Sequence, residues 1–135
     1  MKKIMLIALV FSASYTHASD WALLDTSDIA QVYLDKSSVA RFGKIRKAWI
    51  AYSYKDAETY NGKSYKSSKT LGLYSCVERT SGIYQSTSYA DEYGKGLVVS
   101  SWQIPSKDVH FSEVVPDSIG EVTIDAICKI KLPAA

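Results

Sequence analysis

The chain has 135 residues, of which 47% are hydrophobic and 22% charged, and its 16 Lys and Arg outnumber 14 Asp and Glu by a formal net charge of +2. Lys2 and Lys3, at the extreme N-terminus, account for that excess, so residues 19–135 are formally neutral. Nucleic-acid binding needs a concentrated excess of positive charge. The charge balance therefore sets aside the nucleic-acid-binding class.

The first 18 residues have the pattern of a signal peptide. Lys2 and Lys3 precede an apolar run at residues 4–13, and the small residue Ala18 ends the segment. The run is about half of the ~20 residues that cross a bilayer, and no later stretch is long and apolar enough, so we expect no transmembrane anchor. No cysteine follows the run as in a bacterial lipoprotein. We expect export to the periplasm, the cell surface or the medium.

Residues 19–135 have the length of one ordinary domain and contain no internal repeat, so we predict a single domain. Cys76 and Cys128 are the only cysteines. Because export places them where thiols oxidise, we expect a structural disulfide between them. Closing a loop of this length stabilises the fold by about 4 kcal/mol. The alternative is a redox-active pair, which usually has two cysteines close in sequence.

Short stretches rich in Val, Ile, Tyr and Trp recur between polar clusters, which is typical of an antiparallel sheet. Large side chains on both faces of residues 45–54 predict a central strand there. Asn61-Gly62 tolerates positive φ and predicts a hairpin turn, and Thr80-Ser81-Gly82 predicts a second turn. In chain order the predicted strands are residues 21–24, 31–34, 45–54, 65–76, 83–89 and 96–103.

The segment from residue 118 to residue 130 supports two interpretations. Every second residue from Val122 to Leu132 is apolar, which is the alternation of a strand. Ser118 followed three residues later by Glu121 is a capping-box signature, and apolar residues follow it at helical spacing. Gly120 weakens the case for a helix. The residues alone leave helix and strand open.

Catalytic and metal-binding patterns find little support. His110 is the only histidine in residues 19–135, so neither a Ser-His-Asp arrangement nor a multi-histidine metal site is indicated. Asp91 with Glu92, or Asp56 with Glu58, would supply a pair of acids for a hydrolase, but such acids on loops are usually solvated. We expect no enzyme activity, no metal and no cofactor.

Tyrosines and cations interleave between residues 60 and 84, with no acid before Glu78. Tyrosine offers a large, stiff contact surface with a polar tip, and cations attract acidic partners, so this mixture suits recognition of a macromolecule or a glycan. The alternative is an ordinary sheet face with half-buried tyrosines and solvated lysines. The candidate partner-binding residues are Tyr60, Lys63, Tyr65, Lys66, Lys69, Arg79 and Tyr84.

The order of several short motifs resembles the surface-adhesin protein E family of exported Gram-negative proteins. The resemblance implies an α+β, mainly β fold, in which a disulfide holds a C-terminal helix on the concave face of an antiparallel sheet, here of about six strands. It favours a helix at residues 118–130 and a tight bend at Gly94 and Gly96. The motifs are Val32-Tyr33-Leu34-Asp35, Lys47-Ala48-Trp49-Ile50, Tyr65-Lys66-Ser67-Ser68, Tyr74-Ser75-Cys76, Glu92-Tyr93-Gly94-Lys95-Gly96 and Val115-Pro116-Asp117-Ser118.

The resemblance also implies a function. It predicts a non-catalytic binding module whose sheet and central hairpin, residues 65–89 here, contact host extracellular-matrix or serum proteins. Because the chain lacks the lipid-attachment cysteine of a lipoprotein, we keep a second hypothesis, a periplasmic accessory or inhibitor protein, for example of a cell-wall hydrolase. A homodimer is also kept open.

Overall fold

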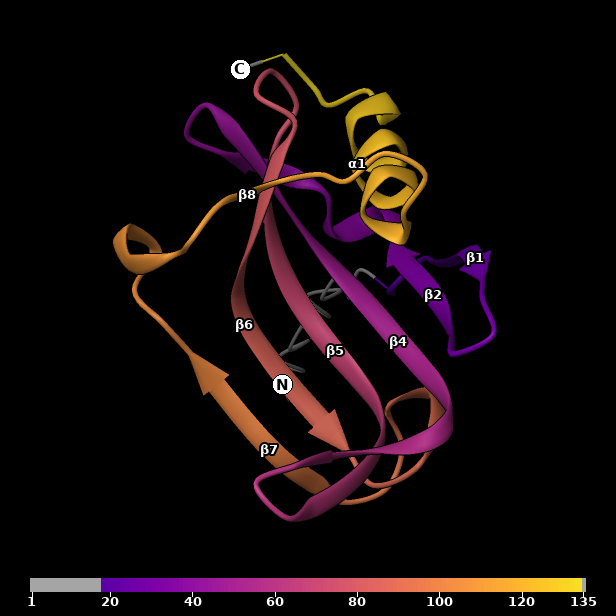
Figure 1. Cartoon of the computed structure of the whole chain (residues 1–135). Coiled ribbons are helices and arrows are strands. Elements are labelled where there is room, and N and C mark those ends of the chain that lie inside the picture. Colours follow the sequence, from indigo (N-terminus) through magenta and orange to yellow (C-terminus); the bar gives the residue numbers. More distant parts are fainter. Residues whose placement is uncertain (1–17, 135) are drawn as a thin grey trace, which may run out of the picture.

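The structure, a computed structural model, describes residues 18–134. The predicted signal peptide lies outside the described residues except for its last residue, Ala18. A single curved sheet carries one helix near one of its ends (Figure 1). No helix in the described part of the chain is long and apolar enough to cross a membrane.

The sheet is antiparallel and eight-stranded, with the main path β1-β2-β4-β5-β6-β7. The bounds of these six strands are β1 Trp21–Thr26, β2 Ala30–Asp35, β4 Ile45–Tyr60, β5 Lys63–Ser75, β6 Thr80–Tyr89 and β7 Val98–Gln103. The prediction of about six strands is confirmed for this path, with the strand at residues 45–54 in its interior. Apart from a short strand at residues 40–42 that intervenes between β2 and β4, each strand of the path follows its neighbour in the chain, so the path is a simple meander.

Two short strands were not predicted. β3 (Ala40–Phe42) pairs with β4, and β8 (Ser112–Glu113) pairs with β6. β2 and β3 both pair with β4, and β3 follows β2 in the chain after the 3-10 turn η1 (Lys36–Ser38). In the same way, β7 and β8 both pair with β6, and β8 follows β7 after the 3-10 turn η3 (Ser106–Asp108). Each short strand therefore continues a longer one beyond a bend.

One of the two predicted turns is confirmed. Asn61 and Gly62 join β4 to β5 with φ of 49° and 75°. The prediction of a turn at Thr80-Ser81-Gly82 is wrong, because these residues begin β6 and the turn lies at residues 76–79. A Cβ on Gly82 would lie 2.5 Å from Cγ1 of Val109, so the glycine marks the close passage of another segment over the strand.

The C-terminal segment forms the helix α1 (Ile119–Lys129). Ser118 is its N-cap, and its Oγ accepts a hydrogen bond from the backbone N–H of Glu121 at 3.3 Å. The Glu121 carboxylate accepts one from the backbone N–H of Asp117 at 2.7 Å. The first bond is that of a capping box and satisfies a donor in the first helical turn. The second reaches one residue further back than in a standard capping box and fixes the residue before the N-cap. The helix interpretation is therefore confirmed.

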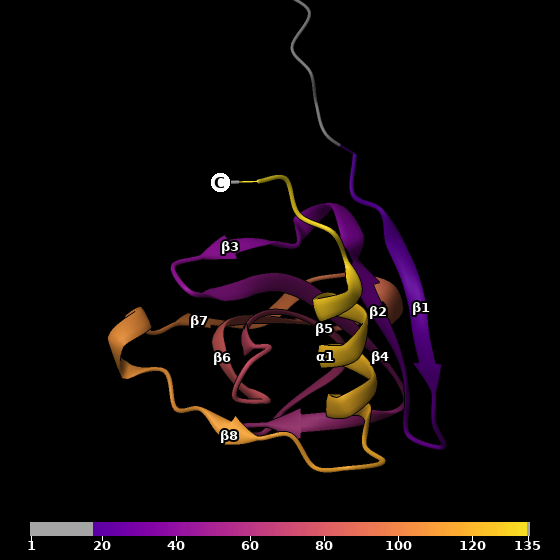
Figure 2. The ribbon, with the colours of Figure 1, turned by 90° about the horizontal axis from the view of Figure 1, so that it is seen from above.

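The core lies between α1 and the concave face of the sheet, which curls around the helix (Figure 2). Side chains alternate between the two faces of each strand, so every second residue of β2 and β4 points at α1. Burial of these apolar surfaces supplies the main favourable term in folding. The buried residues of this core are Val32, Leu34, Val39, Ala48, Ile50, Tyr74, Ile124 and Ile127.

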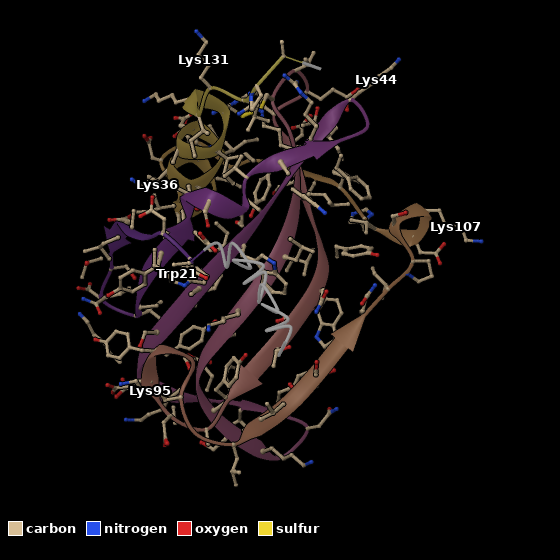
Figure 3. All side chains as sticks on the ribbon, turned by 180° about the vertical axis from the view of Figure 1, so that it is seen from behind. Trp21, Lys36, Lys44, Lys95, Lys107 and Lys131 are labelled. Carbon is tan, nitrogen blue, oxygen red and sulfur yellow. A yellow bond between two sulfur atoms is a disulfide. The ribbon has the colours of Figure 1, made fainter. Side chains whose placement is uncertain are left out.

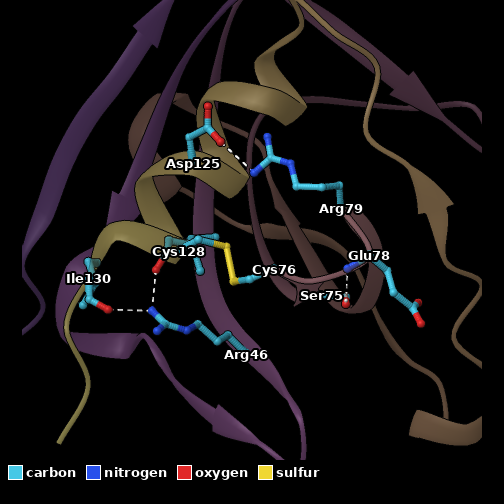
Figure 4. Close-up of a disulfide and its surroundings, with 9 residues drawn as sticks. Arg46, Ser75, Cys76, Glu78, Arg79, Asp125, Cys128 and Ile130 are labelled. Carbon is cyan, nitrogen blue, oxygen red and sulfur yellow. Dashed lines mark hydrogen bonds and ion pairs between the residues drawn. A yellow bond between two sulfur atoms is a disulfide. The ribbon is translucent and has the colours of Figure 1, made fainter.

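Covalent and polar contacts fix the end of α1 to the sheet. The disulfide between Cys76 and Cys128 joins the turn after β5 to the last turn of the helix, across a Cα–Cα distance of 5.9 Å (Figure 4). Arg46 on β4 donates from Nη1 to the carbonyl oxygens of Ile127 at 2.7 Å and Ile130 at 2.6 Å. The Ile127 carbonyl otherwise accepts only a long bond of 3.4 Å from the backbone N–H of Ile130, so the guanidinium adds a strong cap at the helix C-terminus.

Candidate functional site

The β4–β5 hairpin extends beyond the rest of the sheet. The pairing of β2 with β4 ends at Tyr54, and the pairing of β6 with β5 ends at Ser67. Residues 55–66 therefore form a two-stranded projection, here called the arm, which no other described strand pairs with (Figure 1). Because an isolated two-stranded hairpin is marginally stable in water, side-chain contacts at its root are needed to order it.

Aromatic side chains at its root and tip shape the arm. Tyr65 meets Tyr54 edge to face, with ring centroids 5.8 Å apart. Burial, with Tyr54 and Glu58 nearby, raises the pKa of Tyr65 above its ordinary value, so its hydroxyl stays protonated. At the tip, Tyr60 pairs with Lys63 across the hairpin and is 49% exposed. The arm thus presents Tyr60 and Lys63 to solvent at its tip, with Tyr65 packed at its root.

The 3-10 turn η2 (Glu92–Gly94) folds over the convex face of the sheet, the face that points away from α1. The buried hydroxyl of Ser67 accepts a hydrogen bond from the backbone N–H of Gly94 at 2.8 Å. Gly94 and Gly96 have φ of 71° and 79°, as the predicted tight bend requires. Lys66, at the root of the arm, lies 3.5 Å from the Glu92 carboxylate. Both groups are exposed, so this ion pair contributes little stability.

Lys69 is the central cation of the convex face. Its Nζ lies 5.6 Å from the ring centroid of Trp21 and 5.7 Å from that of Tyr89, within the range of cation–π attraction. A Cβ on Gly94 would lie 2.7 Å from Cε of Lys69, so η2 packs directly on the lysine stem. The cations that form ion pairs within residues 18–134 are Lys36, Lys66 and Arg79. The ammonium of Lys69 is therefore positioned by rings and backbone and not by a carboxylate.

Two hollows flank Lys69 on this face, and Trp21, which is labelled in Figure 3, borders both. The larger, about 240 Å³, is walled by Tyr33 and Tyr93, whose rings meet edge to face at 6.3 Å. The Tyr93 hydroxyl donates to Oε1 of Gln31 at 3.0 Å, which fixes that ring in place. The smaller hollow has a volume of about 210 Å³. Asp35 also lines this smaller hollow. The larger hollow has aromatic walls, Lys69 and no carboxylate, so it suits a ligand that combines an apolar group with a negative charge.

Two of the predicted binding residues lie elsewhere. Arg79 is at the opposite end of β5 from the arm and pairs with Asp125 of α1 at 2.7 Å (Figure 4). Tyr84 lies further along β6, packs on Phe42 at a centroid distance of 6.3 Å and accepts a hydrogen bond from Gln103 at 2.9 Å. The residues that share the half of the sheet near the arm are Tyr60, Lys63, Tyr65, Lys66 and Lys69.

The aromatic residues around Lys69 were missed by the sequence-based prediction. They belong to β1, β2, β6 and η2, so no local spacing relates them to β5. Only the register of the sheet brings them together. These residues are Trp21, Tyr33, Tyr89 and Tyr93. Within the described range, no three His, Cys, Asp or Glu side chains gather as a metal site requires.

Comparisons with known proteins agree with this architecture. The structure of protein E from non-typeable Haemophilus influenzae aligns with a TM-score of 0.56 and 14% identity, covering 87% of this chain and 81% of that chain. A second crystal form of Haemophilus influenzae protein E aligns with a TM-score of 0.56 and 14% identity, covering 83% of this chain and 96% of that chain. At this identity the likeness concerns the fold. No protein of curated function matches the chain.

The family comparison covers most of the described residues. The sequence pattern of the family described as surface-adhesin protein E matches residues 21–129, from the first residue of β1 to the last residue of α1. The match includes both cysteines, the arm and the η2 bend. This chain therefore belongs to the surface-adhesin protein E family.

Proposed function

We propose that this protein is an exported, non-catalytic binding module that recognises a protein partner with the arm and with Lys69. The observation that carries the proposal is the arm itself, because residues 55–66 leave the sheet as a separate hairpin with Tyr60 exposed at its tip. Ordered tyrosines supply large contact areas at low conformational cost, which is why protein interfaces are enriched in them.

The chemistry of the surface points to an acidic partner. Lys63, Lys66 and Lys69 follow one another along β5, and Lys69 forms no ion pair with the described residues. Exposed cations raise the rate of association with an acidic surface, and salt screens that attraction. Host extracellular-matrix or serum proteins are the partner class that the family suggests.

Export and a single domain belong to the same proposal. Residues 1–18 act as the signal peptide, residues 19–135 fold as one unit, and the protein works in the periplasm, at the cell surface or outside the cell. A homodimer would form through β7, whose outer edge no described strand covers. This edge has no charged side chain, and Leu97 and Val98 beside it are 82% and 57% exposed. Such edges invite pairing with a second strand.

Surface plasmon resonance against immobilised matrix extract and serum proteins tests the proposal. Replacing Lys63, Lys66 and Lys69 by alanine should weaken binding and flatten its salt dependence while the circular dichroism spectrum stays unchanged. The matched control replaces Lys44 and Lys107, which lie away from the arm (Figure 3), and should bind as the wild type does. Equal binding by both variants would contradict the proposal.

A periplasmic inhibitor is the second candidate, and the shape of the arm favours it. A narrow hairpin that leaves the sheet has the form of a segment that enters the cleft of a hydrolase. Lysozyme activity should fall when the purified protein is added if this candidate is correct, and Tyr60→Ala should restore it. Unchanged lysozyme activity together with salt-sensitive binding to matrix protein would select the first candidate.

A further inference from the structure

A cavity of about 470 Å³ opens on the concave face of the sheet, away from Lys69. Its lining residues come from the first turns of α1, the strands β4 to β6, and the segment that joins β7 to β8. Its volume falls within the range of small-ligand sites. The binding function proposed above uses the arm and the convex face, so it leaves this cavity without a role.

Apolar and aromatic groups form part of the cavity wall. Ile50 and Thr70 belong to the sheet, and Tyr52 and Tyr74 add aromatic rings with hydroxyl groups. A Cβ on Gly72 would lie 2.6 Å from ring atoms of Tyr74, so this ring lies flat across the glycine. Burial raises the pKa of Tyr52, with a smaller contribution from Tyr54, and burial likewise raises the pKa of Tyr74. Both hydroxyls therefore stay neutral.

An unpartnered hydroxyl also belongs to the cavity wall. Thr123 of α1 lines the cavity and is only 3% exposed, and its Oγ1 has no hydrogen-bond partner among the described residues. Among the described residues, the hydroxyl of Thr80 is also buried without a hydrogen-bond partner, but Thr80 does not line the cavity. Buried polar side chains nearly always have a partner. A ligand with its own hydrogen-bonding groups would supply the one that Thr123 lacks.

The charges around the cavity narrow the class of ligand. No Lys or Arg lines it, and the charged or titratable groups, Asp108 and His110, are both exposed at the rim. An anionic ligand would find no cation, and a hydrocarbon would leave Thr123 unsatisfied. Ile83 and Ile104 add apolar surface beside the hydroxyl groups. Apart from Asp108 and His110 at the rim, the wall is uncharged and partly apolar, and it carries several hydroxyl groups.

We propose that this cavity binds one unit of an uncharged saccharide. A pyranose ring has an apolar C–H face for the isoleucine and tyrosine walls, and its hydroxyl groups donate and accept hydrogen bonds around its edge. Oγ1 of Thr123 pairs with one of these hydroxyls, and Asp108 at the rim accepts from another. The site is separate from the protein-binding surface, so the two are tested independently.

NMR titration of the protein purified from its exported form tests the saccharide site. The probes are methyl glucoside, methyl galactoside and N-acetylglucosamine, with glucuronic acid as the charged comparison. At least one neutral probe should shift the backbone amide signals of Gly82, Gly120 and Thr123 in a saturable manner, without shifting that of Gly94 on the other face. Glucuronic acid should bind more weakly, because the cavity offers its carboxylate no cation.

Two variants probe the contacts. Thr123→Val keeps the shape of the side chain and removes its hydroxyl, so affinity should fall by about tenfold, as the loss of one hydrogen bond implies. Ile83→Trp fills the cavity from a side chain that is 49% exposed and should abolish binding. The controls Thr87→Val and Ile29→Trp lie outside the cavity and should leave affinity unchanged. Absence of shifts with every neutral probe, or equal affinity in Ile83→Trp, would overturn the proposal.

Discussion

Glycines in the interior of β5 and β6 mark places where another part of the molecule lies on the backbone. Gly72 accommodates the ring of Tyr74, and Gly82 accommodates Val109. The sequence-based prediction placed Gly82 in a turn, because a glycine next to Ser and Thr is typical of one. Close approach and turn formation both favour glycine, so the residue type alone does not separate them.

Gly72→Ala should destabilise the protein by about 1–3 kcal/mol, because the added methyl group overlaps the ring of Tyr74 and forces it out of its place. Urea denaturation measures the change. The double variant Gly72→Ala/Tyr74→Ala is the control, since it removes the group that the methyl meets. Its cost should be smaller than the sum of the two single costs. Additive costs would show that Gly72 serves some other purpose.

Asp35 at the end of β2 predicts a pH dependence of stability. Burial alone would raise its pKa, but hydrogen bonds from the Ser37 side chain and from the backbone of Asp20 and Ser37 outweigh burial and hold the pKa below 3.8. Its stabilising effect is therefore present at neutral pH and is lost as the pH falls through the lowered value. Asp35→Asn should cost about 1–3 kcal/mol at pH 7.

Denaturation of wild type and Asp35→Asn across pH 2 to 7 checks this expectation. The difference between them should begin to shrink below about pH 4, where Asp35 of the unfolded chain gains a proton, and should be lost as the pH falls through the lowered pKa of the folded protein. Asp28→Asn, at an exposed carboxylate, provides the control. A difference between wild type and Asp35→Asn that stays constant to pH 2 would contradict the role assigned to this group.

At the scale of elements, η2 holds Lys69 in place, and a pair of glycines isolates that effect. Gly94 and Gly43 both have positive φ, of 71° and 61°, but only at Gly94 would a Cβ meet Lys69. Both alanine variants carry backbone strain, so Gly43→Ala measures strain alone. Gly94→Ala should lower the free energy of unfolding, measured by urea denaturation, by more than Gly43→Ala does, and it should also weaken partner binding. Equal costs would show that η2 does not support Lys69.

The C-terminal helix depends on its disulfide. Replacing Cys76 and Cys128 by serine should lower stability by about 4 kcal/mol, because the unfolded chain regains the entropy of an open loop. Hydrogen exchange should then accelerate first in α1. Arg79→Ala removes the exposed ion pair to Asp125 and should cost less than about 1 kcal/mol, which makes it the control. Unchanged exchange in α1 after serine replacement would contradict a clamping role.

Local patterns predicted most elements and failed where long-range contacts decide. Short stretches rich in Val, Ile, Tyr and Trp between polar clusters predicted the strands of the main path, and Asn61-Gly62 predicted the β4–β5 turn. The segment at Ser118 was open because alternation and a capping box coexist in it. The helix prevails because Ile124 and Ile127 then share one buried face against the sheet. β3 and β8 escaped prediction because strands of three and two residues carry too little periodicity.

For the whole molecule, the binding surface combines what the sequence predicted with what only the fold assembles. The interleaved tyrosines and lysines indicated the region around β5. Trp21 precedes Lys69 by 48 positions, so its ring reaches the lysine through sheet register alone. Arg79 illustrates the converse, because its place in the sequence suggested the same surface while the fold turns it toward α1. The composition of the sequence predicts what type of surface the protein has, and the topology of the sheet decides which residues lie on it.

The central claim is that the arm contacts a protein partner, and photo-crosslinking in living cells tests it most directly. A benzophenone amino acid placed at Tyr60 lies at the tip of the arm, and the same residue placed at Val77, which is 92% exposed in the turn at the other end of β5, is the matched control. Illumination in the presence of matrix or periplasmic proteins should yield a covalent adduct from position 60 and none from position 77. Adducts of equal yield from both positions, or from neither, would contradict the claim.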